Sequence, residues 1–212
     1  KVMKAKTLNS TLREMRAVEP GEEYEFHFGQ EPVRNVGRFG AHFYGSPLDD
    51  ETLTHEDNML YLEFSEDLFD SVSVDDFLAF VAKVGAMTEF DSGYCGYAFK
   101  HLFMSLTEES FLDISHKAMR YIGFDISSDG FRLYARHRVC NVSWLTLFGK
   151  QITENLGGVS AVRKALPGSM KILQVGSGIM VRAAERPIVG DVNRRAVDVA
   201  PLRGVGDALA HA

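Results

Sequence analysis

The stretch MLYLEFSEDLFDSVSVDDFLAFVAKVGAMTE, residues 59–89, decides the fold class because its hydrophobic period changes partway along. Leu60, Leu62 and Phe64 occupy every second position, which predicts a half-buried strand over residues 59–64. From Ser73 to Glu89 the apolar side chains recur at steps of three and four, which predicts a helix that Ser73 can cap. The apolar stripe expected on this helix comprises Phe77, Phe80, Val81, Val84 and Met87.

Further strands and helices are expected on both sides of this stretch. Residues 24–28, 37–44 and 59–64 predict an antiparallel meander, because the connections between them are too short for helical crossovers. Gly176-Ser177-Gly178 predicts a hairpin between two strands. The other expected strands cover residues 131–142, 171–175 and 179–184, and the other expected helices cover residues 7–18, 108–120, 143–155 and 159–166. Strands and helices therefore come in clusters, which favours an α+β fold with largely antiparallel sheets and packed helices, in a single compact domain over residues 1–212.

Composition and charge exclude several classes of protein. The chain has 212 residues, of which 45% are hydrophobic and 25% charged, so it has enough apolar bulk for a core. Its net charge of −6 argues against a basic nucleic-acid binder, and we expect no direct nucleic-acid binding. No apolar run approaches the roughly twenty residues of a membrane span. Two cysteines, Cys95 and Cys140, are too few for a disulfide framework, and no apolar signal-peptide core is evident, so the expected compartment is the cytoplasm.

The net charge hides a strong asymmetry along the chain. Residues 1–113 contain 22 acidic and 9 basic side chains, a net charge of −13, whereas residues 114–212 have a net charge of +7. Within residues 49–91 there are 13 carboxylates and one base, Lys83. This acidic surface has two interpretations: a solvated face that keeps the protein soluble, or a patch that steers a basic partner. The carboxylates proposed for partner binding are Asp49, Asp50, Glu51, Glu56, Asp57, Glu63, Glu66, Asp67 and Asp70.

Motifs for common enzyme chemistry are absent from the sequence. It contains no GxxxxGK[ST], HExxH, GxSxG or CxxC pattern. His55-Glu56-Asp57 is the one place where a histidine adjoins a carboxylate cluster, so a metal-dependent enzyme remains an alternative. A solvated surface loop is the favoured interpretation, because three adjacent loop residues do not point at one centre. Alternating Arg132, Arg136 and Arg138 are interpreted as an exposed strand face or as partners of internal carboxylates. We therefore expect no catalytic residue, no metal and no cofactor.

Five segments in the second part of the chain, taken in their order and spacing, resemble the bacterial type VI secretion immunity family, the TsiV-like proteins. The segments are SGYCGYA at residues 92–98, RYIGFD at 120–125, NVSWLTLFG at 141–149, LGG at 156–158 and PIVGDVNR at 187–194. Their composition indicates structural roles, with glycines for turns, Trp144 for the core, and a local pair between Asp191 and Arg194.

The resemblance implies an immunity protein that binds and neutralises an antibacterial type VI secretion toxin without chemistry of its own. Relatives of this family are associated with nuclease toxins, so the expected partner is a cognate nuclease effector with a basic groove. An inhibitor of such a groove would use clustered carboxylates, which the acidic stretch supplies. A non-catalytic adaptor domain is the other alternative, and the aromatic content leaves room for a homodimer surface.

Overall fold

The computed structural model describes residues 5–19, 22–29, 39–46, 58–99, 108–126, 138–139, 141–194 and 199–210. These residues form helices and mostly antiparallel sheets, which confirms the predicted α+β class. Their contacts divide the chain into two compact units. Unit 1 comprises residues 1–68 and 130–136, and unit 2 comprises residues 69–129 and 137–212. The expectation of one domain over residues 1–212 stays a prediction.

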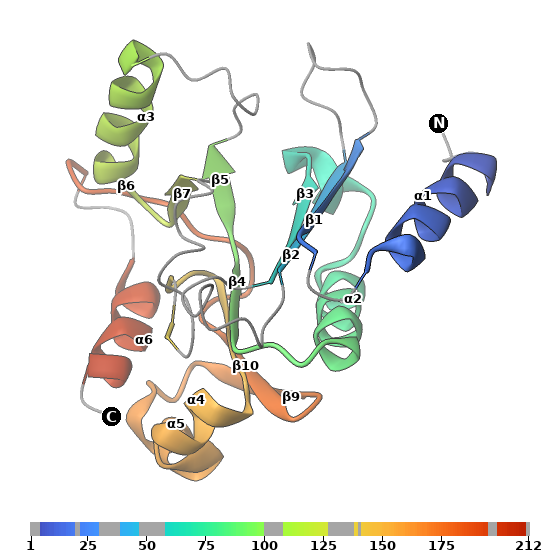
Figure 1. The fold of residues 1–212 in the computed structure, drawn as a ribbon. Helices are drawn as coiled ribbons and strands as arrows, with labels where there is room; N and C mark the ends of the chain where they lie inside the picture. Colours follow the sequence, from blue (N-terminus) through green and yellow to red (C-terminus); the bar gives the residue numbers. More distant parts are fainter. Residues whose placement is uncertain are drawn as a thin grey trace. The chain divides into compact units, whose positions relative to one another are not determined.

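A three-stranded antiparallel meander forms the sheet of unit 1, as predicted (Figure 1). Its strands lie in the order β1, β2, β3, and residues that are directly opposite in the register share a face. Phe43 lies between Phe26 and Leu60, so the alternating apolar side chains of all three strands lie on the same face of the sheet. The elements of this unit are α1 (Ala5–Ala17), β1 (Tyr24–Gly29), β2 (Phe39–Gly45) and β3 (Met59–Phe64).

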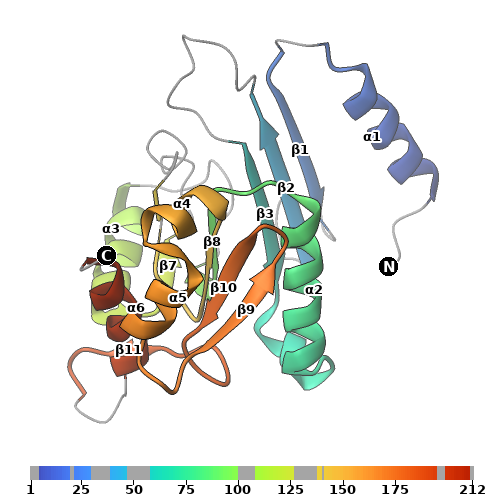
Figure 2. The same ribbon diagram turned by 90° about the horizontal axis from the view of Figure 1, so that it is seen from below.

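A four-stranded antiparallel sheet is the centre of unit 2, with strands in the order β4, β8, β10, β9. Helix α2 packs on one face, where Gly85 lies close to Val175 and Leu147. Helices α4, α5 and α6 cover the other face, where Phe148 and Ile179 belong to the main core cluster (Figure 2). The elements are α2 (Val74–Met87), β4 (Ser92–Cys95), β8 (Leu145–Phe148), α4 (Lys150–Asn155), α5 (Gly158–Ala165), β9 (Lys171–Val175), β10 (Gly178–Arg182) and α6 (Ala200–Ala210).

Short pairings complete unit 2. Strand β11 pairs with β6 antiparallel, and β5 pairs with β7 parallel. The short strands β6 and β7 directly follow helix α3. The remaining elements are the 3₁₀ helix η2 (Glu66–Asp70), which spans the boundary between the units, β5 (Tyr97–Phe99), α3 (Glu108–Arg120), β6 (Tyr121–Ile122), β7 (Phe124–Ile126) and β11 (Gly190–Asp191).

The helix expected over residues 143–155 is wrong in its first half. Residues 145–148 form strand β8, and only residues 150–155 are helical. All four residues of β8 are buried, because helices cover both faces of the central sheet. Such a strand shows no alternation of apolar and polar residues, and a short continuous apolar run cannot be distinguished from a buried helix by its period.

Helix α2 begins and is capped as predicted, but its buried stripe differs from the predicted one. The Ser73 side chain accepts a hydrogen bond from the backbone N–H of Asp76 at 3.0 Å. Phe77 is buried as expected, whereas Phe80 is 40% exposed and Met87 is 78% exposed. The buried face instead runs through Gly85, where the absence of a side chain lets the helix approach Val175 closely.

Two sequence expectations fall outside the described residues. The connection between the expected strands 37–44 and 59–64 lies largely within the undescribed residues 47–57, and His55 of the possible metal site lies there too. The strand expected over residues 131–142 includes Arg132 and Arg136, which also lie outside the described part, as does Cys140. Arg138 lies within it, but in no strand.

Candidate functional site

The carboxylates expected to contact a partner lie partly within the described structure. Asp49, Asp50, Glu51, Glu56 and Asp57 lie outside the described residues. The segment that contains these five begins after Ser46 and ends before Asn58, and the Ser46 N–H donates a hydrogen bond to Asn58 Oδ1 at 2.7 Å. This bond joins Ser46 to Asn58 at the end of the unit 1 sheet where β2 ends and β3 begins.

The other four predicted carboxylates lie within the described residues, on β3 and η2. Glu63 lies on β3 opposite Gly40, and its carboxylate lies over that glycine, where a Cβ would approach Glu63 Oε2 to 2.7 Å. Glu66 and Asp67 lie in η2, where Asp67 accepts a hydrogen bond from the Ser65 hydroxyl. Asp70 ends η2 and is exposed.

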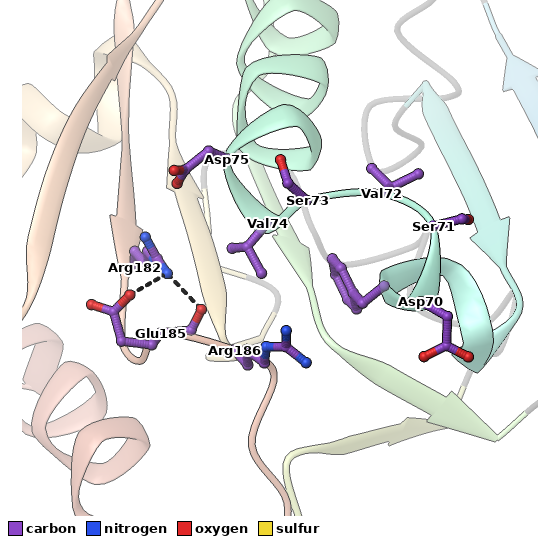
Figure 3. A pocket seen from close by; sticks show the side chains of 10 residues that line it. Asp70, Ser71, Val72, Ser73, Val74, Asp75, Arg182, Glu185 and Arg186 are labelled. Carbon is purple, nitrogen blue, oxygen red and sulfur yellow. Dashed lines mark hydrogen bonds and ion pairs between the residues drawn. The ribbon is translucent and has the colours of Figure 1, made fainter.

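Asp70 also lines an open hollow of about 510 Å³ in unit 2 (Figure 3). One wall is the segment from Phe69 to Asp75 that leads into α2, and the other wall is formed by Arg182, Glu185 and Arg186. Arg182 is 7% exposed, and its guanidinium donates to the backbone oxygens of Ala184 and Glu185 and to the Glu185 carboxylate at 2.9, 2.5 and 2.8 Å. The hollow is therefore a polar surface depression whose buried arginine already has its partners.

No group of three or more histidine, cysteine, aspartate or glutamate side chains is placed to hold a metal ion within the described residues. Cys95 is the free thiol of the described part; it is half-buried, and desolvation raises its pKa to about 12, so little reactive thiolate forms at neutral pH. In the same part of the chain, no helix is both long and apolar enough to cross a membrane.

The family-like segments meet at an ion pair that sequence reasoning missed. Arg120 at the end of α3 donates two hydrogen bonds to the Asp191 carboxylate of β11, at 3.0 and 2.7 Å. The expected pair of Asp191 with Arg194 is confirmed at 3.6 Å, and Asp191 also accepts from the Asn193 N–H at 3.0 Å. The hydrogen bonds from Arg120 lower the pKa of Asp191 and raise that of Arg120. Because 71 residues separate the two, no local pattern could have paired them.

A second set of contacts joins the other family-like segments. The Tyr94 hydroxyl donates to Asp125 at 2.6 Å, and the Asn141 side-chain amide lies 3.4 Å from the same carboxylate. Trp144 is 1% exposed and donates its indole N–H to the Ala184 carbonyl at 2.8 Å. Its ring stacks on Phe77 with centroids 6.0 Å apart. These contacts hold the scaffold together, and Trp144 lies in the core as predicted.

The glycine of RYIGFD shows why that segment is constrained. Gly123 has a φ of +98°, a region that residues with a Cβ rarely adopt. A Cβ at this position would lie 2.4 Å from the carbonyl oxygen of Ile188, so the segment PIVGDVNR packs directly against it.

Comparison with known proteins identifies the class of this scaffold. A family model described as type VI immunity for VRR-NUC matches residues 1–211, which defines an immunity protein of the type VI secretion system. Because the match spans nearly the whole chain, the protein belongs to this family, TsiV. The predicted family is thereby confirmed.

Comparison with solved structures finds the same fold. A type VI secretion system protein of Pseudomonas aeruginosa superposes with a TM-score of 0.73 at 24% sequence identity. The alignment covers 94% of this chain and 56% of that one, so this chain spans little more than half of that protein's length. No curated protein sequence matches the chain significantly.

Proposed function

We propose that this protein binds a VRR-NUC nuclease toxin of the type VI secretion system and neutralises it. The family match over residues 1–211 is the observation that carries the proposal. The protein would act by binding alone, in the cytoplasm, with no cofactor and no catalysis of its own.

The proposed mode of inhibition is occupation of the toxin's substrate groove by the acidic surface. A nuclease must present a basic surface to the phosphates of its substrate, and a carboxylate-rich inhibitor is attracted to that surface. The net charge of −12 over residues 49–91 supplies this attraction. The proposed contact residues are Asp49, Asp50, Glu51, Glu56, Asp57, Glu63, Glu66, Asp67 and Asp70.

Co-expression with the toxin tests the function itself. Cells that produce the cognate VRR-NUC toxin should survive when this protein is produced as well, and should die when an unrelated acidic protein replaces it. Continued killing in the presence of the folded protein would refute the proposed function.

Charge reversal tests the acidic surface separately. The triple variant Asp49→Lys, Asp50→Lys, Glu51→Lys should slow association with the toxin by at least about tenfold at low ionic strength, because steering can raise association rates by roughly 10- to 1000-fold. The difference should shrink at high salt, where charges are screened. The matched control reverses Asp113, Glu154 and Asp207, three exposed carboxylates outside the acidic stretch, and changes the net charge equally. Equal slowing by both triple variants would show that net charge matters and the location of the charge does not.

A further inference from the structure

The sheet of unit 1 has one face built from aromatic and aliphatic side chains, which we call the aromatic face. It includes Tyr24, Phe26, Phe39, Phe43, Leu60 and Phe64, which share one parity in the strand register. This face is partly open, because Phe39 is 39% exposed and Leu60 is 44% exposed. Large apolar side chains that are exposed together on a sheet mark an interaction surface more often than a solvated one.

The rings of the aromatic face are already arranged against one another. Phe39 and Phe64 lie opposite in the register with ring centroids 5.5 Å apart, and Tyr24 stacks on Phe43 at 5.4 Å with an interplanar angle of 28°. Side chains fixed in this way lose little conformational entropy when a partner covers them. Aromatic residues also dominate the energetic centres of protein interfaces.

The charge around this face indicates the kind of partner. Residues 22–29, 39–46 and 58–68 contain six carboxylates and no lysine or arginine; two of the six, Glu25 and Glu63, lie on the opposite face of the sheet, and the other four lie at its ends. Glu22 and Glu23 precede β1 at one end of the sheet, while Glu66 and Asp67 follow β3 at the other end. An apolar surface with an acidic border is typical of a contact with a basic protein surface, since apolar contacts supply affinity and opposite charges supply orientation.

The same charges argue against two other occupants. A nucleic acid would bring its phosphates against the bordering carboxylates, which would repel them. A second copy of this chain would bring two acidic borders together, and like charges across an interface oppose binding.

We propose that the aromatic face is the apolar centre of the surface that binds the nuclease toxin, docking against the toxin's basic nucleic-acid-binding side. The inference rests on the proposed function and adds a contact that carboxylates alone do not supply. The carboxylates accelerate encounter and depend on salt, whereas the aromatic face sets the lifetime of the complex and is nearly independent of salt.

The test is the affinity of the double variant Phe39→Ala, Leu60→Ala for a purified, catalytically inactive VRR-NUC domain. Both side chains are partly exposed, so the variant should fold, which circular dichroism checks. The dissociation constant should rise at least about tenfold, by a similar factor at low and high salt, through faster dissociation. The matched control is Met87→Ala, Met119→Ala, which removes two side chains exposed by 78% and 70% in unit 2 and should leave the affinity unchanged.

Each outcome separates this inference from the proposed function. If the wild-type protein binds the toxin and protects cells, but the folded double variant binds equally well, the aromatic face is not the contact and the inference fails alone. If the wild-type protein neither binds nor protects, the proposed function fails. A wild-type homodimer that the double variant dissociates, with unchanged toxin affinity, would assign this face to self-association and also overturn the inference. Should the double variant not fold, Leu60→Gln replaces it with the same expected direction.

Discussion

Replacing Trp144 by phenylalanine tests whether the family-like segments act as scaffold. The indole is 1% exposed and donates to the Ala184 carbonyl at 2.8 Å. Phenylalanine removes this hydrogen bond at a cost of about 1 kcal/mol. The cost is no larger because the Ala184 carbonyl still accepts a hydrogen bond from the Arg182 guanidinium at 2.9 Å. The smaller ring leaves a gap beside Phe77 that costs a further 1–2 kcal/mol, roughly. The free energy of unfolding should therefore fall by about 2–3 kcal/mol in total.

Thermal unfolding followed by circular dichroism measures this loss. For a chain of this length, a loss of about 2–3 kcal/mol lowers Tm by about 5–10 °C. Toxin affinity measured well below the transition should stay at the wild-type value, because Trp144 is buried in unit 2 and has no surface to offer. The exposed substitution Met87→Ala serves as the control and should leave Tm nearly unchanged. A Tm within about 1 °C of wild type, or a folded variant with lost affinity, would refute the reasoning.

Three further predictions concern the constrained backbone, the ion pair and the half-buried thiol. Gly123→Ala should lower the free energy of unfolding by at least about 2 kcal/mol in urea titration, because its left-handed conformation strains a Cβ that also meets the Ile188 carbonyl; unchanged stability would contradict this packing. Arg120 lowers the pKa of Asp191 in the folded protein. The pair therefore stabilises the fold fully at pH values above the ordinary aspartate pKa, and this stabilisation is lost as the pH falls through the lowered pKa of Asp191. At neutral pH the Asp191→Asn variant should therefore unfold more readily than the wild type, and its free energy of unfolding should fall less steeply as the pH is lowered. An unaltered dependence of stability on pH would count against the pair. Cys95, with its raised pKa, should react with a thiol reagent at pH 8 more slowly in the native protein than after unfolding, and equally rapid labelling of both states would contradict the raised pKa.

Local patterns predicted the elements of this fold where one face of a strand or helix meets solvent. Strand β3 and helix α3 begin and end at the predicted residues, because alternation and helical spacing are visible when burial is one-sided. Strand β8 escaped prediction because its residues are buried on both faces. The exposed Met87 was misassigned for a related reason: the spacing of apolar residues shows a stripe but does not show where a sheet lies against it.

The candidate site was less accessible to sequence reasoning than the fold. The pairing of Asp191 with Arg194 could be predicted because the two residues are three positions apart, whereas Arg120 comes from a distant helix. The charge count located the acidic stretch, but it could not show that Phe39 and Leu60 share an open sheet face. That juxtaposition depends on strand register, which a count of charges along the chain does not contain.

The most direct test of the central claim is the nuclease activity of the purified VRR-NUC toxin on DNA as this protein is titrated in. The account predicts that cleavage falls to the background level near one equivalent, and that the Phe39→Ala, Leu60→Ala variant requires a much larger excess for the same inhibition. Undiminished cleavage with a large excess of the folded wild-type protein would contradict it.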